Sequence, residues 1–335
     1  MIDVPISVLE LAGVRAGATS ADALADMLTM AVAADGLGAD RFWIAEHHNM
    51  PAVAATSPPV LAAAVAMRTS RIRVGSGGVM LPNHSPYVVA EQFAALEALA
   101  PGRVDVGLGR APGADPVTAW ALRRTQEGLG PEEFPEHVNL VRSWLSDRGV
   151  SVGDQGIPLS VTPAASGYPQ LWLLGSSDYS ARLAGRLGIR YAYAGHFGQL
   201  DPAYVLDLYR SEFRPSDELT DPWAMVCTSA VIGATHEDAW RLAGPALALW
   251  MGIRTNRMEP ILSPEEADLR LTDVDRTTIG GVRHVGTADA VIGALERLVR
   301  SCDAQELMIA TTAYDVETRI DTLRPILAAR SARAR

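Results

Sequence analysis

Side chains able to do chemistry gather at five places in this sequence, each directly after a short apolar run. The first is Glu46-His47-His48, which follows the run Phe42–Ala45. An acid and two imidazoles are groups that proteins use for proton transfer and hydrogen bonding near neutral pH. The other clusters are Ser76-Gly77-Gly78 followed by Met80, Arg110 in GLGRAPG, Gly175-Ser176-Ser177 followed by Ser180, and Tyr193 with His196 in YAGHF. They predict a single site only if the fold brings them together.

Alternating strand-like and helix-like segments predict such a fold. The strands are expected at 4–9, 41–45, 72–75, 104–108, 171–174, 190–194, 223–232 and 306–310. The helices are expected at 21–34, 57–68, 86–99, 179–187, 202–213, 236–250, 288–300 and 316–329. Most strands lack polar alternation, as expected when both faces of a sheet are covered. The pattern predicts the α/β class and a (β/α)8 TIM barrel with rim insertions, with a doubly wound sheet as the rival.

The domain organisation follows from what interrupts this alternation. Residues 111–163 and 252–285 do not fit it, and we interpret them as irregular excursions on the barrel rim. No internal repeat or low-complexity linker indicates a second domain. Residues 1–335 are therefore expected to form one barrel domain.

In a barrel of this kind the carboxyl ends of the strands carry the site. Gly175, Ser176, Ser177 and Ser180 lie between an expected strand and an expected helix, where free N–H groups and the helix dipole favour a phosphate. An ordinary serine cap is the alternative. Arg110 on the preceding glycine-lined loop could bind the same phosphate, which predicts a phosphorylated cofactor. GLGRAPG has Pro112 where a dinucleotide fingerprint needs its last glycine, so a Rossmann interpretation is weak.

The remaining strand ends predict a flat ligand and acid–base chemistry. Gly77-Gly78 would let backbone lie against a flat ring, with a β-bulge as the alternative. His47 and His48 are adjacent, so they cannot both face inward from an extended strand, and no spacing typical of a metal site occurs. We interpret Glu46, His47 and His48 as catalytic residues, with a structural hydrogen bond as the default for a lone histidine.

Composition excludes several classes of function. The chain has 335 residues and a formal net charge of −10, which argues against a nucleic-acid surface. All 29 basic residues are arginine, so lysine chemistry is absent. The two cysteines fit no metal spacing, no apolar run has the length of a membrane helix, and the first residues do not resemble a signal peptide. A cytoplasmic enzyme is expected.

These residues resemble a known family, the bacterial luciferase-like flavin monooxygenases, and in particular its small single-subunit branch. The matching stretches are RFWIAEHHNM, VGSGGVMLPNHSP, AEQF, PGRVDVGLGRAPG, WLLGSSDYSA and VGTADAV. The resemblance spans nearly the whole chain. It implies a (β/α)8 barrel that binds reduced FMN, usually supplied by a separate flavin reductase, and that oxidises a small organic substrate with O2 through a C4a-peroxyflavin.

The resemblance also assigns roles to individual residues. His47 matches the histidine needed for the peroxide chemistry, with His48 beside it. Gly77-Gly78 matches the pair whose non-prolyl cis peptide lies against the flavin ring, and Arg110 matches the phosphate-binding arginine. Ser176, Ser177 and Ser180 match the phosphate-binding turn, and Met80, Tyr193 and His196 fall near the substrate or flavin.

The sequence departs from the luciferases at two places, and alternative functions remain open. The reactive luciferase cysteine aligns with Gly109 and a luciferase tryptophan is missing near Tyr193, so we expect no thiol chemistry near the flavin and argue against light emission. An F420-dependent dehydrogenase of the same superfamily and a non-catalytic flavin-binding protein are the alternatives within it, and a metal-dependent barrel hydrolase is the alternative outside it. A homodimer is possible, since relatives are often dimers.

Overall fold

A computed structural model describes the chain except for residues 112, 114, 124–131, 147–148, 153–154, 165–166, 273–282 and 331–335. Its parallel strands are β1 (Ile6–Glu10), β2 (Arg41–Ile44), β3 (Arg73–Ser76), β4 (Val79–Met80), β5 (Val104–Gly109), β8 (Gln170–Gly175), β9 (Arg190–Ala194), β10 (Ala224–Ile232), β11 (His284–Gly286) and β12 (Glu306–Ala310). A separate antiparallel hairpin consists of β6 (Val150–Val152) and β7 (Ile157–Leu159).

Eight of the parallel strands close into a barrel. They follow the order β1-β2-β3-β5-β8-β9-β10-β12, and β12 pairs with β1 to complete the ring. The register includes Val8 opposite Phe42 on one side of β1 and Val8 opposite Ile309 on the other. The predicted (β/α)8 barrel is confirmed, and the doubly wound sheet is excluded because such a sheet would stay open.

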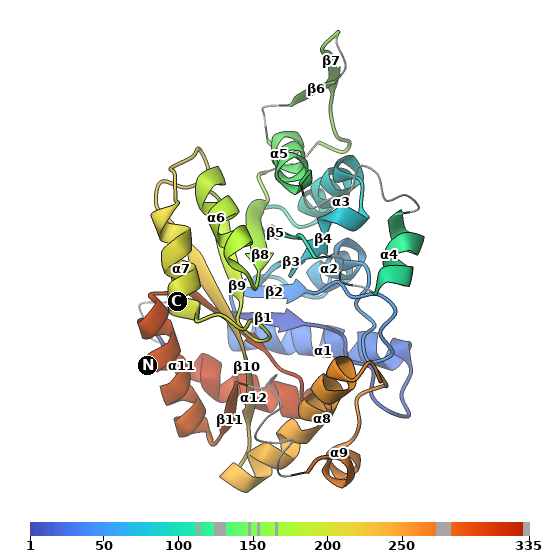
Figure 1. Cartoon of the computed structure of the whole chain (residues 1–335), viewed down its shortest axis with the longest axis vertical. Coiled ribbons are helices and arrows are strands. Elements are labelled where there is room, and N and C mark those ends of the chain that lie inside the picture. Colours follow the sequence, from blue (N-terminus) through green and yellow to red (C-terminus); the bar gives the residue numbers. More distant parts are fainter. Residues whose placement is uncertain are drawn as a thin grey trace.

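Helices connect and surround these strands (Figure 1). They are α1 (Ser20–Leu37), α2 (Pro58–Ala66), α3 (Pro86–Leu99), α4 (Pro116–Arg123), α5 (Phe134–Trp144), α6 (Asp178–Leu187), α7 (Pro202–Ser211), α8 (His236–Arg254), α9 (Pro264–Arg270), α11 (Ala288–Cys302) and α12 (Val316–Ala328), with a 3-10 turn at Leu81–Asn83. Local sequence explains several ends: Thr19 and Asp22 form a reciprocal capping box before α1, and Gly38 ends it at φ +86°. No helix among the described residues is long and apolar enough to cross a membrane.

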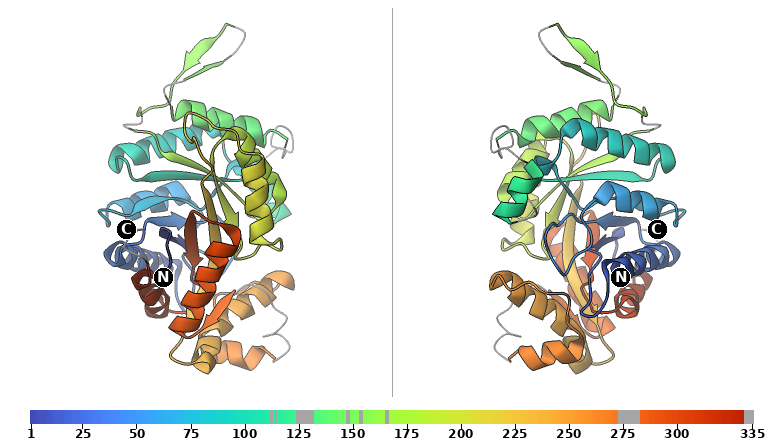
Figure 2. Two further views of the ribbon diagram at one scale, coloured as in Figure 1. Left: turned by 90° about the vertical axis from the view of Figure 1, so that its left-hand side faces the viewer. Right: turned by 90° about the vertical axis from the view of Figure 1, so that its right-hand side faces the viewer.

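The two stretches expected to be irregular contain regular elements. The first holds α4, α5 and the hairpin β6–β7, and the second holds α9 and β11. Helix α5 packs beside α3 as part of the barrel's outer layer. The hairpin instead projects away from the barrel body (Figures 1 and 2). The apolar spacing of Val138, Val141 and Trp144, all buried, indicates α5 in the sequence, although no helix was expected there.

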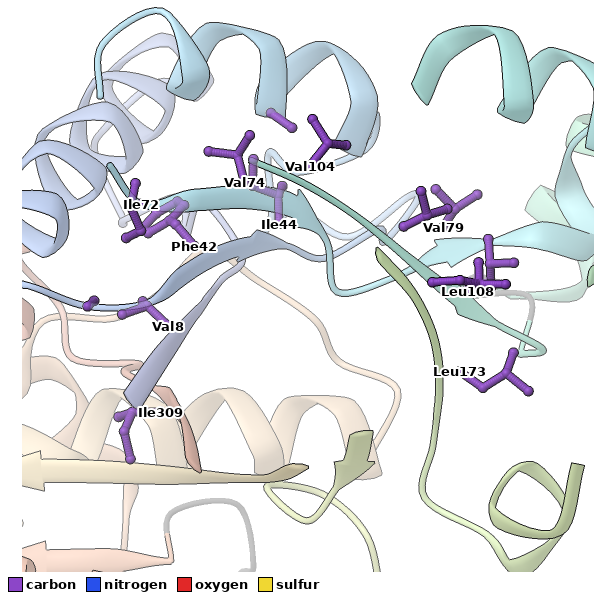
Figure 3. Close-up of a cluster of buried hydrophobic side chains, with 14 of the residues drawn as sticks. Val8, Phe42, Ile44, Ile72, Val74, Val79, Val104, Leu108, Leu173 and Ile309 are labelled. Carbon is purple, nitrogen blue, oxygen red and sulfur yellow. The ribbon is translucent and has the colours of Figure 1, made fainter. Parts of the chain in front are cut away.

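Each barrel strand buries both of its faces, which explains the missing polar alternation. Outward-facing residues such as Val8, Phe42 and Val74 pack under the helices (Figure 3). Inward-facing residues such as Leu9 and Trp43 form a separate cluster inside the barrel. Successive side chains along one strand therefore point alternately to the outer core and to the barrel interior.

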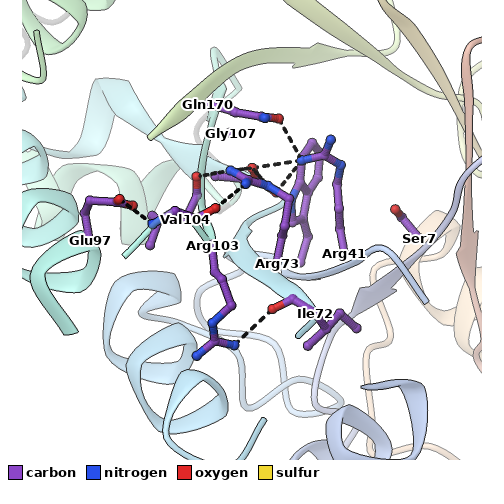
Figure 4. A network of polar contacts seen from close by, with 12 residues as sticks. Ser7, Arg41, Ile72, Arg73, Glu97, Arg103, Val104, Gly107 and Gln170 are labelled. Carbon is purple, nitrogen blue, oxygen red and sulfur yellow. Dashed lines mark hydrogen bonds and ion pairs between the residues drawn. The ribbon is translucent and has the colours of Figure 1, made fainter. Parts of the chain in front are cut away.

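A buried charge network fills the amino end of the barrel interior (Figure 4). Arg41 Nη1 donates to both oxygens of Asp105 at 2.9 and 2.8 Å, and its Nε donates to Glu306 Oε1 at 2.8 Å. Arg73 Nε and Trp43 Nε1 also donate to Asp105, at 2.8 and 2.9 Å. Burial alone would raise the pKa of Asp105, but Arg41 and Arg73 outweigh it and lower that pKa. Burial dominates at Glu306 and raises its pKa.

Glycine at position 107 is required by the close approach of β5 to its neighbours. A Cβ there would lie 2.1 Å from the carbonyl oxygen of Ser76 and 2.8 Å from Leu174 Cδ1. We expect Gly107→Ala to lower the free energy of unfolding by about 1–3 kcal/mol, the usual cost of overpacking. Gly36→Ala is the matched control because nothing lies within 4 Å of its added Cβ and it sits in α1, where alanine should stabilise by about 0.5–1 kcal/mol. Urea unfolding measures the change in free energy of unfolding of each variant. Equal changes in the two variants would contradict the requirement for glycine at position 107.

Candidate active site

A cavity of about 390 Å³ lies at the carboxyl ends of the barrel strands. The structure brings most of the sequence-predicted site residues into its wall. These are His47, Gly77, Gly78, Met80, Arg110, Gly175, Ser176, Ser177, Ser180, Tyr193 and His196. Glu46 and His48 do not line it. Arg110 and Ser177 line the same cavity, as the prediction of a single site at the strand ends requires.

One part of the cavity wall combines an arginine, a helix N-terminus and serine hydroxyls. Arg110 makes no hydrogen bond or ion pair with any described residue, and its guanidinium carbon lies 4.0 Å from the centre of the Tyr179 ring. Ser177 is the N-cap residue of α6, yet its hydroxyl makes no capping hydrogen bond. Ser180, one turn into the helix, is 3% exposed. A free cation beside an uncapped helix N-terminus and serine hydroxyls is the arrangement that binds phosphate.

Gly77 and Gly78 form another part of the cavity wall. The peptide bond between Gly77 and Gly78 is cis, as the resemblance implies. A Cβ at Gly77 would lie 2.5 Å from Leu9 Cδ1, and one at Gly78 would lie 2.8 Å from the carbonyl oxygen of Gly107. Both glycines are therefore required by the packing of the barrel itself.

His47 is the member of the Glu46-His47-His48 cluster that faces the cavity. Its backbone N–H donates to the carbonyl oxygen of Ala55 at 3.0 Å, which fixes the chain independently of the side chain. Its Nδ1 atom is buried without a hydrogen-bond partner among the residues described. Burial lowers the pKa of the imidazole, and nearby Glu46 only partly opposes this. The ring is therefore neutral near pH 7.

Glu46 and His48 belong to a network behind this wall. Glu46 is fully buried, and its Oε1 accepts hydrogen bonds at 2.8 Å from Nε2 of both His48 and His84. Its Oε2 accepts the backbone N–H of Met80 at 3.0 Å. Burial raises the pKa of Glu46, but these hydrogen bonds outweigh it and lower the pKa, so the group is an anion. The network fixes the end of β2 to the segment after Gly77-Gly78.

The end of β9 supplies the wall opposite the glycines. His196 lines the cavity, and burial lowers its pKa to about 3, with His47 and Arg283 adding to the effect. The hydroxyl of Tyr193 donates to the carbonyl oxygen of Leu200 at 2.7 Å. Tyr193 therefore offers the cavity its ring, and its hydroxyl is already occupied.

A thiol lies in the cavity wall, and the expectation of no thiol chemistry near the flavin stays a prediction. Cys227 lines the cavity although Gly109 stands at the position of the luciferase cysteine. Burial raises the pKa of the Cys227 thiol, so it stays protonated. The residue could have been found from the sequence, because it lies two positions after Met225 on β10 and so shares its inward face. His84 was missed as well, since its link to Glu46 spans 38 residues.

The described residues contain no group of three or more His, Cys, Asp or Glu side chains suited to a metal ion. The two histidines nearest to such an arrangement, His48 and His84, both donate to one carboxylate oxygen of Glu46. Their Nε2 atoms therefore carry hydrogen and cannot bind a metal in this geometry.

The buried histidines predict a loss of stability on mild acidification. Burial lowers the pKa of His196 to about 3 and that of His284 to about 4, against about 6.5 in an unfolded chain. Between these values the unfolded chain binds more protons, so the free energy of unfolding falls as pH drops below about 6.5. We expect a lower urea midpoint at pH 5 than at pH 7.

A histidine variant separates the contribution of the histidines to the pH dependence of stability from that of the carboxylates. Glu306 acts in the opposite direction, because its raised pKa makes the folded state the better proton acceptor. His284→Gln removes one depressed histidine and should reduce the difference between the two pH values. If the urea midpoints at pH 5 and pH 7 differ as much in the variant as in the wild type, the contribution given to His284 is contradicted.

Comparison with known proteins agrees with this geometry. A family model described as luciferase-like monooxygenase matches residues 4–305. A luciferase-like monooxygenase of Escherichia coli strain K12 is 36% identical over 333 residues, covering 95% of this chain and 94% of that protein. The N-acetyl-S-alkylcysteine monooxygenase of Bacillus subtilis is 38% identical over 192 residues, 56% of each chain. The crystal structure of apo-MsnO8 superposes with a TM-score of 0.89 at 32% identity, covering 97% of this chain and 98% of that one. The chain belongs to the luciferase-like monooxygenase family.

Proposed function

We propose that this protein is a flavin-dependent monooxygenase that uses reduced FMN and O2 to oxidise a small organic substrate. The observation that carries the proposal is the convergence on one cavity of an arginine without a partner among the described residues, an uncapped helix N-terminus and a neutral histidine. The first two would bind a phosphate, and the third could transfer a proton beside the ring to which that phosphate belongs.

The residues present fit FMN. Arg110 and the hydroxyls of Ser176, Ser177 and Ser180 would hold its phosphate, and the backbone at Gly77-Gly78 would support its ring. When bound, the reduced flavin supplies electrons to O2, so that one oxygen atom enters the substrate and the other leaves as water. The apolar walls at Leu9, Leu174 and Met308 would limit the access of water to this chemistry.

The chain's own contribution to the reaction centres on His47. Its neutral ring has one nitrogen that can accept a proton and one that can donate. It would hold or move a proton at the oxygen atom being transferred. Glu46 and His48, which the sequence interpretation placed among the catalytic residues, would act as positioning residues, because they fix His47 and Met80 without lining the cavity.

An oxygen-consumption assay tests the function. The protein is supplied with FMN, NADH and a flavin reductase, and O2 uptake and product mass are followed over a panel of substrates. Thioethers are tested first, because a relative is an N-acetyl-S-alkylcysteine monooxygenase. Transfer of a single oxygen atom to the thioether sulfur completes the reaction. A product heavier by one oxygen atom supports the proposal. Substrate oxidation with F420 and without O2 would favour the dehydrogenase alternative, and flavin binding without turnover would favour the non-catalytic one.

Arg110→Met tests the phosphate site directly. A charge-assisted hydrogen bond contributes about 1.5–3 kcal/mol, so FMN should bind about 10- to 100-fold more weakly while riboflavin, which lacks the phosphate, is unaffected. Flavin fluorescence quenching measures both affinities. Arg182→Met on α6 is the control, since Arg182 pairs with Glu212 outside the cavity. An equal loss for FMN and riboflavin would show that Arg110 does not bind the phosphate.

The cellular setting of the enzyme is part of the same proposal. A separate reductase would deliver reduced FMN in the cytoplasm, and the enzyme would work on a small molecule without nucleic acid or membrane. A homodimer is the expected state, and native mass spectrometry checks it. We also propose that residues 1–335 unfold as one domain.

A further inference from the structure

A second histidine faces His47 from another part of the cavity wall. His47 follows β2 and His196 follows β9, and both line the same space. The Nδ1 atoms of both rings are buried and have no hydrogen-bond partner in the described part of the chain. Buried polar atoms are nearly always paired, so two unpaired ones in a single cavity indicate that something else supplies the partner.

Both rings are uncharged in the working pH range. Burial is the main cause for each, and a proton on either ring would disfavour one on the other. Glu46 and His48 are the charged or titratable groups acting on His47, and Arg283 is the further one acting on His196. Each neutral ring has one donor and one acceptor nitrogen, and a molecule filling the cavity that both residues line is the candidate partner for them.

The charges near the rings favour some substrates over others. The described part of the cavity wall contains no carboxylate. Arg283 is exposed and donates to the carbonyl oxygens of Gly195 and Gly198, at 3.2 and 2.7 Å, which holds the turn that carries His196. No described carboxylate forms an ion pair with Arg283, and its positive charge acts on His196 and Tyr193 in the cavity wall, with Asp201 opposing it only at Tyr193. A cationic molecule beside His196 would be repelled by this charge.

We propose that His196 contacts the substrate directly and that, together with His47, it selects an uncharged or anionic substrate with a carbonyl or carboxylate group near the atom that is oxidised. This deepens the proposed function and rests on it only for the reaction. A carbonyl or carboxylate oxygen accepts from an imidazole N–H, whereas a primary ammonium group has no acceptor and adds a positive charge near Arg283. His196 thereby becomes a specificity-determining residue, distinct from the phosphate site.

Three matched probes test the selection: a methylthioalkyl amide, the carboxylic acid of the same chain length and the corresponding primary amine. Calorimetry measures their binding to the wild-type protein in the presence and absence of oxidised FMN. We expect the amide and the acid to bind about tenfold tighter than the amine, the equivalent of about one good hydrogen bond. Equal binding of all three would overturn the proposal.

Two substitutions at His196 separate hydrogen bonding from packing. His196→Phe should remove the preference and weaken amide binding about tenfold, whereas His196→Gln, which keeps a donor and an acceptor, should stay within about threefold of wild type. FMN affinity should not change in either variant. His236→Gln is the matched control, because His236 is exposed on α8 and its only described hydrogen bond is with Trp240. Amide binding to His196→Phe at the wild-type level would overturn the assignment.

Histidine ring signals give a readout that does not depend on turnover or on any variant folding. The chain has seven histidines, so ring-carbon labelling gives few signals. The amide probe should shift the signals of His196 and His47 and leave that of His236 in place. An unshifted His196 signal at saturating amide would overturn the inference. If the probes bind as expected but are not oxidised with reduced FMN and O2, the proposed function fails and the binding assignment stands.

Discussion

His47→Ala is expected to lower kcat about a hundredfold to ten-thousandfold while FMN binds as in the wild type. This range is the usual contribution of a positioned acid–base group. The backbone at His47 is held by Ala55, so removing the side chain should leave the cavity wall in place. Turnover under reduced FMN and O2, together with flavin fluorescence, separates the loss of chemistry from any loss of cofactor.

The pH profile adds a second readout for His47. Burial lowers the pKa of this imidazole below about 6.5, so the acid limb of kcat/KM in the wild type should lie on the acidic side of that value. The limb should disappear in His47→Ala. His236→Gln should keep both the rate and the profile. Full turnover by His47→Ala would remove this residue from the mechanism.

Arg41→Met is expected to lower the free energy of unfolding by about 3–5 kcal/mol, the cost of breaking a buried ion pair by removing one partner. Asp105 would keep Arg73 and Trp43 but lose two hydrogen bonds to Arg41. Glu306 would keep Ser7, whose hydroxyl lies 2.5 Å away, and lose its only described cationic partner. Urea unfolding at pH 7 measures the change.

An exposed ion pair provides the comparison for Arg41. Arg186 is 54% exposed and pairs with Glu212 on the protein surface. Arg186→Met should cost no more than about 1 kcal/mol, since water screens the pair. Similar costs at the two positions would show that the network in the barrel interior contributes little to stability.

The barrel could be predicted because each strand carries its own signal. The bounds of α3, β9 and β12 agree with the expected ranges 86–99, 190–194 and 306–310. Clear breaks precede two of them: α3 begins at Pro86, and Asp303 ends the helix before β12. The elements within 111–163 were not predicted, because glycine and proline obscure the short apolar stripe of α5.

The orientation of side chains after β2 could not be predicted from the sequence. The strand ends at Ile44, so the alternation of faces does not extend to Glu46 and the histidines. Asn49 has a φ of +55°, which turns the chain, and the partners of Glu46 lie as far away as His84. These distant contacts decide which of the three adjacent titratable side chains faces the cavity.

The filled amino end of the barrel has a consequence for the order of events. Since the interior there is occupied by Arg41, Asp105 and their partners, molecules reach the cavity from the strand ends that carry Arg110 and His196. If the protein works as proposed, cofactor and substrate would both enter from this side. The molecule that binds deeper would then have to enter first and leave last, so we expect an ordered rather than a random kinetic scheme.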